Sequence, residues 1–334
     1  MELRFDSAAA ACGPLAPMLL AVPQSVKRDV QEIRFRAGKP IALSLPGKIL
    51  FLTGRGELVH TVTPGCFFTD RPILETLFRQ LCSFSVYSHQ SEIQNGYIAL
   101  RGGHRAGICG TAVLSQGKIS GIRNISSINL RIAREIRGAA DALVVKGEAL
   151  FGGLLLAGPP CCGKTTVLRD LARQLSEARK KVAVIDERGE FAGVWEGEPQ
   201  NDLGPCCDVL DGYPKQEGML QAIRVLSPEF LICDELGGAG EVEAVLESLY
   251  AGVSVIASLH AGSVQELLRR PQAAALLQTG AFQSVALMDG RAAPGKIIRW
   301  MKAGDLLENR RNSDDDRGVC VHRLEQGASA RAAG

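Results

Sequence analysis

The segment from Gly158 to Thr165 combines residue types and spacing that suit a phosphate chain. It reads Gly-Pro-Pro-Cys-Cys-Gly-Lys-Thr and matches G-x4-G-K-[ST], a loop whose main-chain N–H groups converge on phosphate oxygens. Lys164 would neutralise the β- and γ-phosphates, and the Thr165 hydroxyl would ligate Mg²⁺. An apolar strand before the loop and a helix after it favour this function over a chance Gly-rich turn. The nucleotide-binding residues expected are Gly158, Pro159, Pro160, Cys161, Cys162, Gly163, Lys164, Thr165 and Thr166.

Two carboxylates, Asp234 and Glu235, follow the apolar segment 230–233. At the carboxyl end of a parallel strand they would lie beside the phosphate loop, in the crevice where such sheets bind ligands. We expect Asp234 to hold Mg²⁺ through water and Glu235 to polarise the attacking water. A solvated strand end is the alternative.

Three further features are candidates for the same site. Asp186 and Glu187 end the apolar segment 182–185 and could share the activation of water, or they could be solvated turn residues. His260 ends another apolar segment and could report the presence of a γ-phosphate, although a lone histidine is often structural. Arg224 is a candidate phosphate or intersubunit contact, and a surface salt bridge explains it equally well.

Length and composition predict a folded chain of about two domains. The 334 residues exceed what one core usually organises, and 46% hydrophobic with 22% charged residues is ordinary for globular proteins. A net charge of +2 argues against a dedicated nucleic-acid binder. The ten cysteines lack the C-x2-C spacing of a zinc site, so buried reduced thiols are expected. The N-terminal apolar stretch, which two prolines interrupt, does not suit a signal peptide, and no later run is long enough to span a membrane, so we expect a cytoplasmic protein.

The pattern of elements changes near residue 138. Residues 1–138 predict a smaller α+β domain, with a helix over 26–34, a second over 72–82, a hairpin turn at Asn95-Gly96, strands over 97–100 and 105–114, and helical residues 130–137. Residues 139–305 alternate near-continuous apolar strands with helices, which is typical of an α/β domain with a mainly parallel sheet. Residues 306–334 predict a mobile tail.

Four features in this order resemble the type II and type IV secretion ATPase superfamily, and more closely a stage III sporulation family of endospore-forming Firmicutes. They are the phosphate loop, an acidic box (residues 185–190), a Walker B strand ending at Glu235, and a histidine box (residues 258–261). The closer match includes Glu32-Ile-Arg-Phe-Arg, Gly102-Gly-His-Arg-Ala-Gly and the run from Gln200 to Glu235.

This resemblance implies a RecA-like P-loop ATP hydrolase that uses ATP and Mg²⁺. It also implies a homo-hexameric ring in the mother-cell cytoplasm, peripheral to the membrane and bound to membrane proteins of a secretion-like channel to the forespore. The family loop has glycine where this chain has Cys161, which affects the expected rate of hydrolysis more than nucleotide binding. Arg123, Arg131 and Arg134 lie in the segment that reaches the phosphates in related ATPases.

Two other functions remain open at this point. The first is a nucleic-acid translocase or binding ATPase that uses the basic segment 123–137, although that segment lacks aromatic residues between its arginines. The second is a non-catalytic scaffold gated by nucleotide, in which Cys161 has lowered turnover. The sequence has no Asn-Lys-x-Asp segment after the loop, which favours ATP over GTP.

Overall fold

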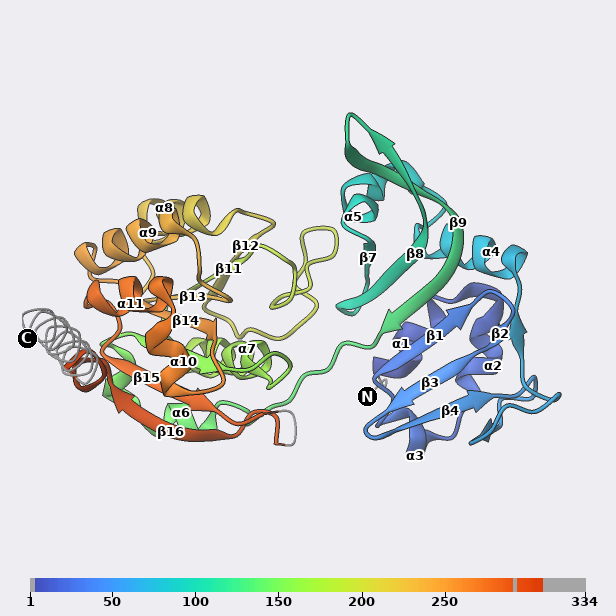
Figure 1. Ribbon diagram of the computed structural model, residues 1–334, viewed down its shortest axis with the longest axis horizontal. Helices are drawn as coiled ribbons and strands as arrows, with labels where there is room; N and C mark the ends of the chain where they lie inside the picture. Colours follow the sequence, from blue (N-terminus) through green and yellow to red (C-terminus); the bar gives the residue numbers. More distant parts are fainter. Residues whose placement is uncertain (1–3, 291–292, 309–334) are drawn as a thin grey trace, which may run out of the picture. The chain divides into compact units, whose positions relative to one another are not determined.

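A computed structural model describes residues 4–290 and 293–308. Its contacts divide the chain into two units (Figure 1). Unit 1 comprises Met1–Arg134 and Gly193–Asn201, and unit 2 comprises Glu135–Ala192 and Asp202–Gly334. The division therefore falls at residue 134 rather than at 138, and the return of residues 193–201 to unit 1 was not expected from the sequence.

Unit 1 is built on an antiparallel sheet that is seven-stranded in the described residues, in the order β5-β4-β3-β1-β9-β8-β7. Its strands are β1 (Glu32–Arg36), β3 (Ala42–Leu45), β4 (Lys48–Leu52), β5 (Leu58–Val59), β7 (Tyr97–Leu100), β8 (His104–Ser115) and β9 (Lys118–Arg131), while β2 (Lys39–Pro40) pairs with β6 (Phe68–Thr69). Its α-helices are α1 (Arg4–Ala10), α2 (Ala16–Leu20), α3 (Gln24–Lys27), α4 (Arg71–Leu81) and α5 (Gln90–Gln94).

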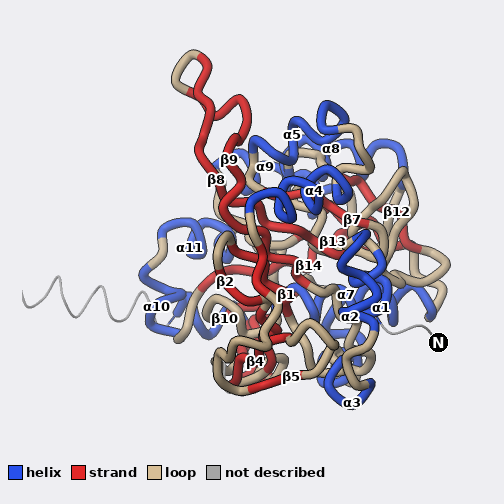
Figure 2. Tube along the Cα trace, turned by 90° about the vertical axis from the view of Figure 1, so that its right-hand side faces the viewer, coloured by secondary structure: helices blue, strands red, loops and turns tan. Residues whose placement is uncertain are grey.

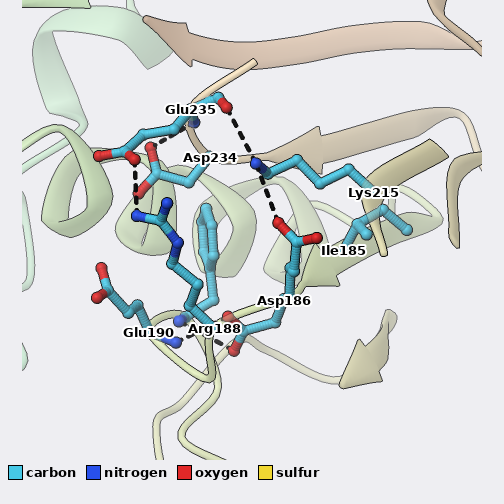
Figure 3. Close-up of a pocket in the computed structure, with 9 residues that line it drawn as sticks. Ile185, Asp186, Arg188, Glu190, Lys215, Asp234 and Glu235 are labelled. Atoms are coloured by element: carbon cyan, nitrogen blue, oxygen red, sulfur yellow. Dashed lines mark hydrogen bonds and ion pairs between the residues drawn. The ribbon is translucent and has the colours of Figure 1, made fainter. Parts of the chain in front are cut away.

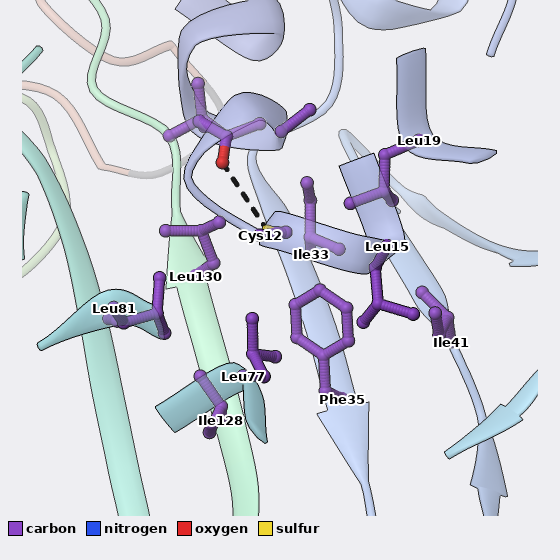
Figure 4. Packing of buried hydrophobic residues seen from close by; sticks show 14 of the residues in the cluster. Cys12, Leu15, Leu19, Ile33, Phe35, Ile41, Leu77, Leu81, Ile128 and Leu130 are labelled. Carbon is purple, nitrogen blue, oxygen red and sulfur yellow. Dashed lines mark hydrogen bonds between the residues drawn. The ribbon is translucent and has the colours of Figure 1, made fainter. Parts of the chain in front are cut away.

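The core of unit 1 lies between this sheet and the short helices. Figure 4 shows Phe35 of β1 close to Leu77 of α4 and Leu15, which precedes α2. Helix α4 buries residues 74, 77 and 81, which recur at the three- and four-residue spacing of one helix face. The apolar N-terminal stretch is thus part of a folded core.

Three sequence predictions for unit 1 were wrong. The helix expected over 26–34 is a short helix followed by β1, because the side chains at 33 and 35 alternate into the core as a strand requires. Asn95-Gly96 ends helix α5 instead of turning a hairpin, and its positive φ glycine is typical of a helix C-terminus. Residues 130–137 are not helical, since β9 runs to Arg131 and a coil follows.

Strands β8 and β9 form a long ribbon whose far part extends beyond the sheet (Figure 2). Residues 109–115 of β8 are exposed, whereas residues 104, 106 and 108 are buried. The predicted turn at Gln116-Gly117 joins the two strands, with both residues at positive φ.

Unit 2 has an α/β fold around a second sheet that is seven-stranded in the described residues, in the order β12-β11-β13-β14-β10-β15-β16. Its strands are β10 (Leu154–Gly158), β11 (Val182–Asp186), β12 (Cys207–Asp211), β13 (Phe230–Cys233), β14 (Ser254–His260), β15 (Ser284–Met288) and β16 (Ile297–Lys302), of which β16 pairs antiparallel with β15 and the others pair in parallel. Its α-helices include α6 (Asp141–Val144), α7 (Lys164–Glu177), α8 (Lys215–Leu226), α9 (Ala239–Tyr250), α10 (Val264–Arg269) and α11 (Pro271–Gln278).

Helices cover both faces of this sheet, as its near-continuous apolar strands predict. In each of the strands β10, β11 and β15, all five residues are buried. Helices α8, α9 and α11 pack on one face, while α7 contacts β10, β11 and β14 from the other (Figure 1). The α/β architecture and the mainly parallel sheet predicted from the sequence are therefore confirmed.

One feature of the strand order determines the geometry of the site. Strand β14 pairs with β10 on one side and with β13 on the other. The strand that leads into the phosphate loop and the strand that ends at Asp234 are thus separated by β14, so residues at the end of β14 lie between them.

The sequence predicts a mobile tail from residue 306, but the first residues of that segment belong to the fold. Leu306 is 4% exposed and lies in the core of unit 2. The rest of that prediction, residues 309–334, lies outside the described residues. Within the described ranges, no helix has both the length and the apolar character needed to cross a bilayer.

Candidate nucleotide site

The phosphate loop connects β10 directly to α7. Gly158 has no room for a side chain, because a β-carbon there would lie 2.6 Å from the Cys162 sulfur. Gly163 has a φ of 93° and precedes the first residue of α7. Cys161 has a φ of 62°, a left-handed conformation that costs an L-residue about 1–2 kcal/mol and that glycine adopts freely. The loop thus bends as a phosphate loop must, with a strained cysteine at one bend.

Lys164 begins α7 and is only 6% exposed. Its ammonium donates to the carbonyls of Gly158 and Pro159, both at 3.1 Å, and lies 2.9 Å from His260 Nδ1. A buried cation needs such acceptors. The loop lysine is therefore held at the mouth of the loop, with its charge directed to the ends of β10 and β14.

Asp234 follows β13 and collects three donors. Its carboxylate accepts from the hydroxyls of Thr165 and Ser258 and, at 3.0 Å, from the Glu235 N–H. Thr165 is on α7 and Ser258 is on β14, so one carboxylate joins the phosphate loop, the Walker B turn and the intervening strand. The two residues expected to hold Mg²⁺, Thr165 and Asp234, are brought together.

Glu235 has a φ of 49°, so its backbone is also left-handed. Its carboxylate lies 2.6 Å from His260 Nε2 and accepts from Arg188 at 2.8 Å. Burial opposes ionisation of this carboxyl, but the hydrogen bond from His260 and the charges of Arg188 and Lys164 outweigh it and lower its pKa. Glu235 is thus held as a carboxylate at neutral pH.

His260 connects Lys164 with Glu235. Because an ammonium can only donate, His260 Nδ1 accepts from Lys164, and its Nε2 then carries the proton that is donated to the Glu235 carboxylate. The position of His260 at the end of β14, between the other two strands, makes this bridge possible.

The first two carboxylates of the acidic box, Asp186 and Glu187, differ in their surroundings. Asp186 is 2% exposed, and its oxygens accept from the main-chain N–H groups of Glu190, Phe191 and Ala192 at 2.7, 3.0 and 2.9 Å. This geometry gives Asp186 the task of shaping the loop that follows β11 and not that of activating water. Glu187 is partly exposed and lies 3.2 Å from the ammonium of Lys215.

Lys215, the first residue of α8, is a member of the site that the sequence analysis missed. Its side chain is 9% exposed and donates to the Glu235 carbonyl at 3.0 Å (Figure 3). A possible signal was its place in the run Asp208 to Met219, which carried part of the family resemblance. Spacing within the chain did not indicate which carboxylates it would face.

The residues of the acidic box and the Walker B turn line one pocket in unit 2 together with Lys215 (Figure 3), whereas Lys164, Thr165 and His260 are not among its lining residues. Arg188 and Glu190 come from the loop after β11, and Asp234 and Glu235 come from the turn after β13. The lining residues are Ile185, Asp186, Glu187, Arg188, Glu190, Phe191, Lys215, Asp234 and Glu235.

The residues expected to hold Mg²⁺ suit that ion in chemistry. Mg²⁺ prefers hard oxygen ligands and usually takes one or two from the protein, with water and phosphate oxygens completing the shell. The Thr165 hydroxyl donates to the Asp234 carboxylate, which places two such oxygens side by side. Across residues 4–290 and 293–308, no group of three or more His, Cys, Asp or Glu is arranged to hold a metal ion.

The structure does not bring every predicted residue to the contacts around Asp234 and Glu235. Arg224 is exposed on α8, where it lines a separate groove between α8 and α9 together with Glu243 and Glu247. Arg123, Arg131 and Arg134 belong to unit 1, in which Arg134 donates to the Val30 carbonyl. The site described above is formed by residues of unit 2.

The fold and the loop together define a class of protein. The structure is similar to that of the Legionella pneumophila ATPase DotB, with a TM-score of 0.51, 18% sequence identity, and coverage of 77% of this chain and 72% of that chain. The chain therefore shares the α/β fold of this ATPase. It belongs to the family described as "Sporulation stage III, protein AA", which it matches over residues 17–304. The family resemblance inferred from the sequence is confirmed.

Two curated relatives are similar to this chain, and the first carries the name of this family. Stage III sporulation protein AA of Bacillus subtilis is 36% identical over 298 residues, which cover 86% of this chain and 92% of that protein. Protein SEEDLING PLASTID DEVELOPMENT 1 of Arabidopsis thaliana is 31% identical over 192 residues, or 54% of this chain and 27% of that longer protein. Similarity to the first extends over nearly the whole length of both chains.

Proposed function

We propose that this protein is an ATP hydrolase. The observation that carries the proposal is the continuous contact from Lys164 in the phosphate loop through His260 to the carboxylate of Glu235. A phosphate-binding cation and a carboxylate suited to act as a base are thereby held at one end of one sheet. The fold of secretion ATPases, which this unit shares with DotB, supports the same activity.

Each side chain has a specific task in this reaction. The main-chain N–H groups of the loop and the ammonium of Lys164 would bind the phosphates, which would compete with the loop carbonyls for that ammonium. Thr165 and Asp234 would hold Mg²⁺, which supplies neutralisation of phosphate charge when bound. Glu235 would orient a water molecule and accept its proton while the water oxygen bonds to the γ-phosphorus. The bond to the bridging oxygen then breaks, and ADP and inorganic phosphate are released.

The family supports a more specific function. We propose that hydrolysis drives a secretion-like channel between mother cell and forespore, with the protein as a homo-hexamer in the mother-cell cytoplasm, peripheral to the membrane and bound to membrane proteins of that channel. The match to the stage III sporulation family and to the Bacillus subtilis protein supports this proposal.

Phosphate release from ATP and Mg²⁺ by the purified chain tests the activity. We expect turnover in the parent and its loss in Lys164→Ala, which lacks the loop cation. ATP binding by calorimetry should fall in the same variant, and unchanged binding there would contradict the site. Phosphate release at background level in the parent would favour a nucleotide-gated scaffold.

Two further measurements test assembly and partner class. Mass measurement with and without a non-hydrolysable ATP analogue should show a ring that forms with nucleotide, and a lasting monomer would contradict it. Addition of single- or double-stranded DNA or RNA should leave turnover unchanged, whereas strong stimulation would indicate a nucleic-acid translocase.

A further inference from the structure

Lys215 is a buried cation at the edge of the candidate site. Its side chain is 9% exposed, whereas lysine side chains are mostly exposed unless they are paired. It begins α8, which packs beside α9 on one face of the sheet of unit 2. A lysine at this depth must be satisfied by acceptors, and those acceptors indicate what it does.

Three acceptors surround the ammonium, each from a different element. The Glu187 carboxylate after β11 lies at 3.2 Å, the Glu235 carbonyl after β13 at 3.0 Å, and the Glu241 carboxylate in the first turn of α9 at 3.7 Å. Glu241 in turn accepts from the N–H groups of Gly237 and Gly238 at 2.6 and 2.9 Å. Lys215 thus joins the acidic box, the Walker B turn and the start of α9.

The contact with Glu235 fixes a backbone conformation that is otherwise unfavourable. With a φ of 49°, Glu235 occupies the left-handed region, which costs an L-residue about 1–2 kcal/mol. Its N–H donates to Asp234 and Ser258, each at 3.0 Å, and its carbonyl accepts from Lys215. Hydrogen bonds on both sides of one residue therefore direct its side chain toward Arg188 (Figure 3) and toward His260.

We propose that Lys215 is a positioning residue for ATP hydrolysis, acting through the carbonyl of Glu235 and the carboxylate of Glu187. It sets the direction of the Glu235 side chain and the spacing between the acidic box and the Walker B turn. Its ammonium is engaged with these groups and not with Lys164 or the loop carbonyls, so it orients the base without binding phosphate. This inference rests on the proposed function, since it assigns a role in that same reaction.

The role separates turnover from binding. Loss of the Lys215 ammonium leaves the phosphate loop and Lys164 in place, so the affinity for ATP should remain. The Glu235 carbonyl loses its donor, and its side chain is then free to leave the direction that hydrolysis needs. Displacements of about 1 Å in a catalytic group cost as much as a hundredfold in rate.

The experiment compares Lys215→Met, Lys215→Arg and Lys180→Met with the parent, measuring kcat and KM for ATP. Methionine keeps the length and the apolar stem of lysine but removes the positive charge and the N–H donors. Arginine keeps the positive charge and the N–H donors. Lys180 pairs with Glu229 at 3.0 Å outside the pocket, so its substitution is the matched control. We expect Lys215→Met to lower kcat at least about tenfold, with KM within about threefold of the parent's. Lys215→Arg should recover at least half of the loss in kcat on a logarithmic scale. The control variant should have the kcat and KM of the parent.

Several results would overturn the inference. They are an unchanged kcat in Lys215→Met, a loss that appears in KM instead of kcat, or an equal loss in the methionine and arginine variants. If Lys215→Met does not fold, the double variant Lys215→Met/Glu241→Gln replaces it, because it removes the positive charge together with one of the carboxylates that face it. The same changes in kcat and KM are expected of the double variant. A parent without hydrolysis overturns the proposed function and this inference with it, whereas parental turnover that Lys215→Met retains overturns only the inference.

Discussion

His260 lies 2.6 Å from the Glu235 carboxylate through Nε2, while its Nδ1 faces the ammonium of Lys164 at 2.9 Å. One imidazole therefore touches both the lysine of the phosphate loop and the proposed base. Its position follows from the strand order, because β14 lies between β10 and β13. A phosphate that draws Lys164 away from His260 would alter the hydrogen bond at Glu235 and so, in the proposed reaction, would couple phosphate binding to water activation.

Glu235→Gln should bind ATP but hydrolyse it at least about a hundredfold more slowly than the parent, as expected when a general base is lost. The amide keeps the size of the side chain and can still accept a hydrogen bond, so the pocket should retain its shape. Calorimetry measures the binding, and phosphate release measures the turnover. Turnover close to that of the parent would transfer the role of base to Glu187.

Arg188→Gln should move the acid limb of the pH–rate profile to higher pH. Burial opposes ionisation of Glu235, and its pKa is nevertheless low because of His260, Arg188 and Lys164. Since hydrolysis needs the carboxylate, the rate falls as pH falls through this pKa, and removing one cation raises the pKa. The measurement is kcat/KM against pH from about 3.5 to 7, because the acid limb of a carboxyl with a lowered pKa falls at the acidic end of that range. Arg269→Gln, at an exposed position on α10, is the control, and coincident acid limbs in Arg188→Gln and the parent would contradict the assignment.

Much of unit 2 could be predicted because local sequence and final environment agree there. Residues 154–157, 182–185 and 230–233 are continuous apolar runs, which only a sheet covered on both faces accommodates. The phosphate loop carries its own signal in residue type and spacing. A residue that ends such a strand has its position fixed by the strand, which is why Glu235 and His260 were found.

The remainder depended on contacts between segments that are distant along the chain. The partners of Lys215 become apparent only when α8 is placed against the ends of β11 and β13. Asp186 and Glu187 look alike in sequence, and only the path of the backbone after β11 turns one carboxylate onto three N–H groups. Asn95-Gly96 has the composition of a hairpin turn, but a helix precedes it and the same positive φ serves to end that helix.

The contacts of residues 193–201 also could not be predicted from a local sequence pattern. Within unit 1, Gln200 accepts from the Gly102 N–H at 2.8 Å, and Arg4 donates to the carbonyls of Gly102 and Gln200 at 2.7 and 3.2 Å. The motifs containing Gly102 and Gln200 carried the family resemblance separately, 98 residues apart in the chain. Their hydrogen bonds explain why residues 193–201 belong to unit 1.

Cys161→Gly should stabilise the protein by about 1 kcal/mol, because a φ of 62° is unfavourable for any residue with a β-carbon and open to glycine. Cys161→Ala is the matched control, since it removes the thiol but keeps the β-carbon. Unfolding in denaturant measures the difference, and ATP turnover should be kept or raised in the glycine variant. Equal stability of the two variants would show that the bend is not strained, and a large loss of turnover in Cys161→Gly would show that the thiol has a role of its own.

Asp186→Asn should destabilise unit 2 by roughly 3 kcal/mol, the scale of losing hydrogen bonds between buried donors and a charged acceptor. The carboxylate accepts from three main-chain N–H groups, whereas an amide offers one oxygen and directs an NH₂ group at the remaining donors. Thermal unfolding measures the loss, and Asp208→Asn, exposed on β12, is the control. A melting temperature of Asp186→Asn that equals that of the control would contradict the structural role of this carboxylate.

His104 should make the stability of unit 1 depend on pH. Its side chain is 1% exposed, and its Nδ1 accepts from the Ala133 N–H at 3.0 Å. Burial, with a smaller contribution from the charge of Arg4, lowers its pKa to about 4. The folded state thus favours the neutral ring, so this stabilisation is complete above the unfolded pKa of about 6.5 and is lost as pH falls through the folded value.

The loss from His104 amounts to roughly 3 kcal/mol, because each pH unit between the folded and unfolded pKa values contributes about 1.4 kcal/mol. His104→Asn keeps an acceptor for Ala133 but has no titrating group, so its stability should not show this loss. Thermal unfolding at about pH 7 and pH 4.5 should therefore find the parent losing more stability on acidification than the variant does. His60→Asn, at an exposed position, should behave like the parent. An equal loss in the parent and in His104→Asn would show that the pH dependence arises from other groups.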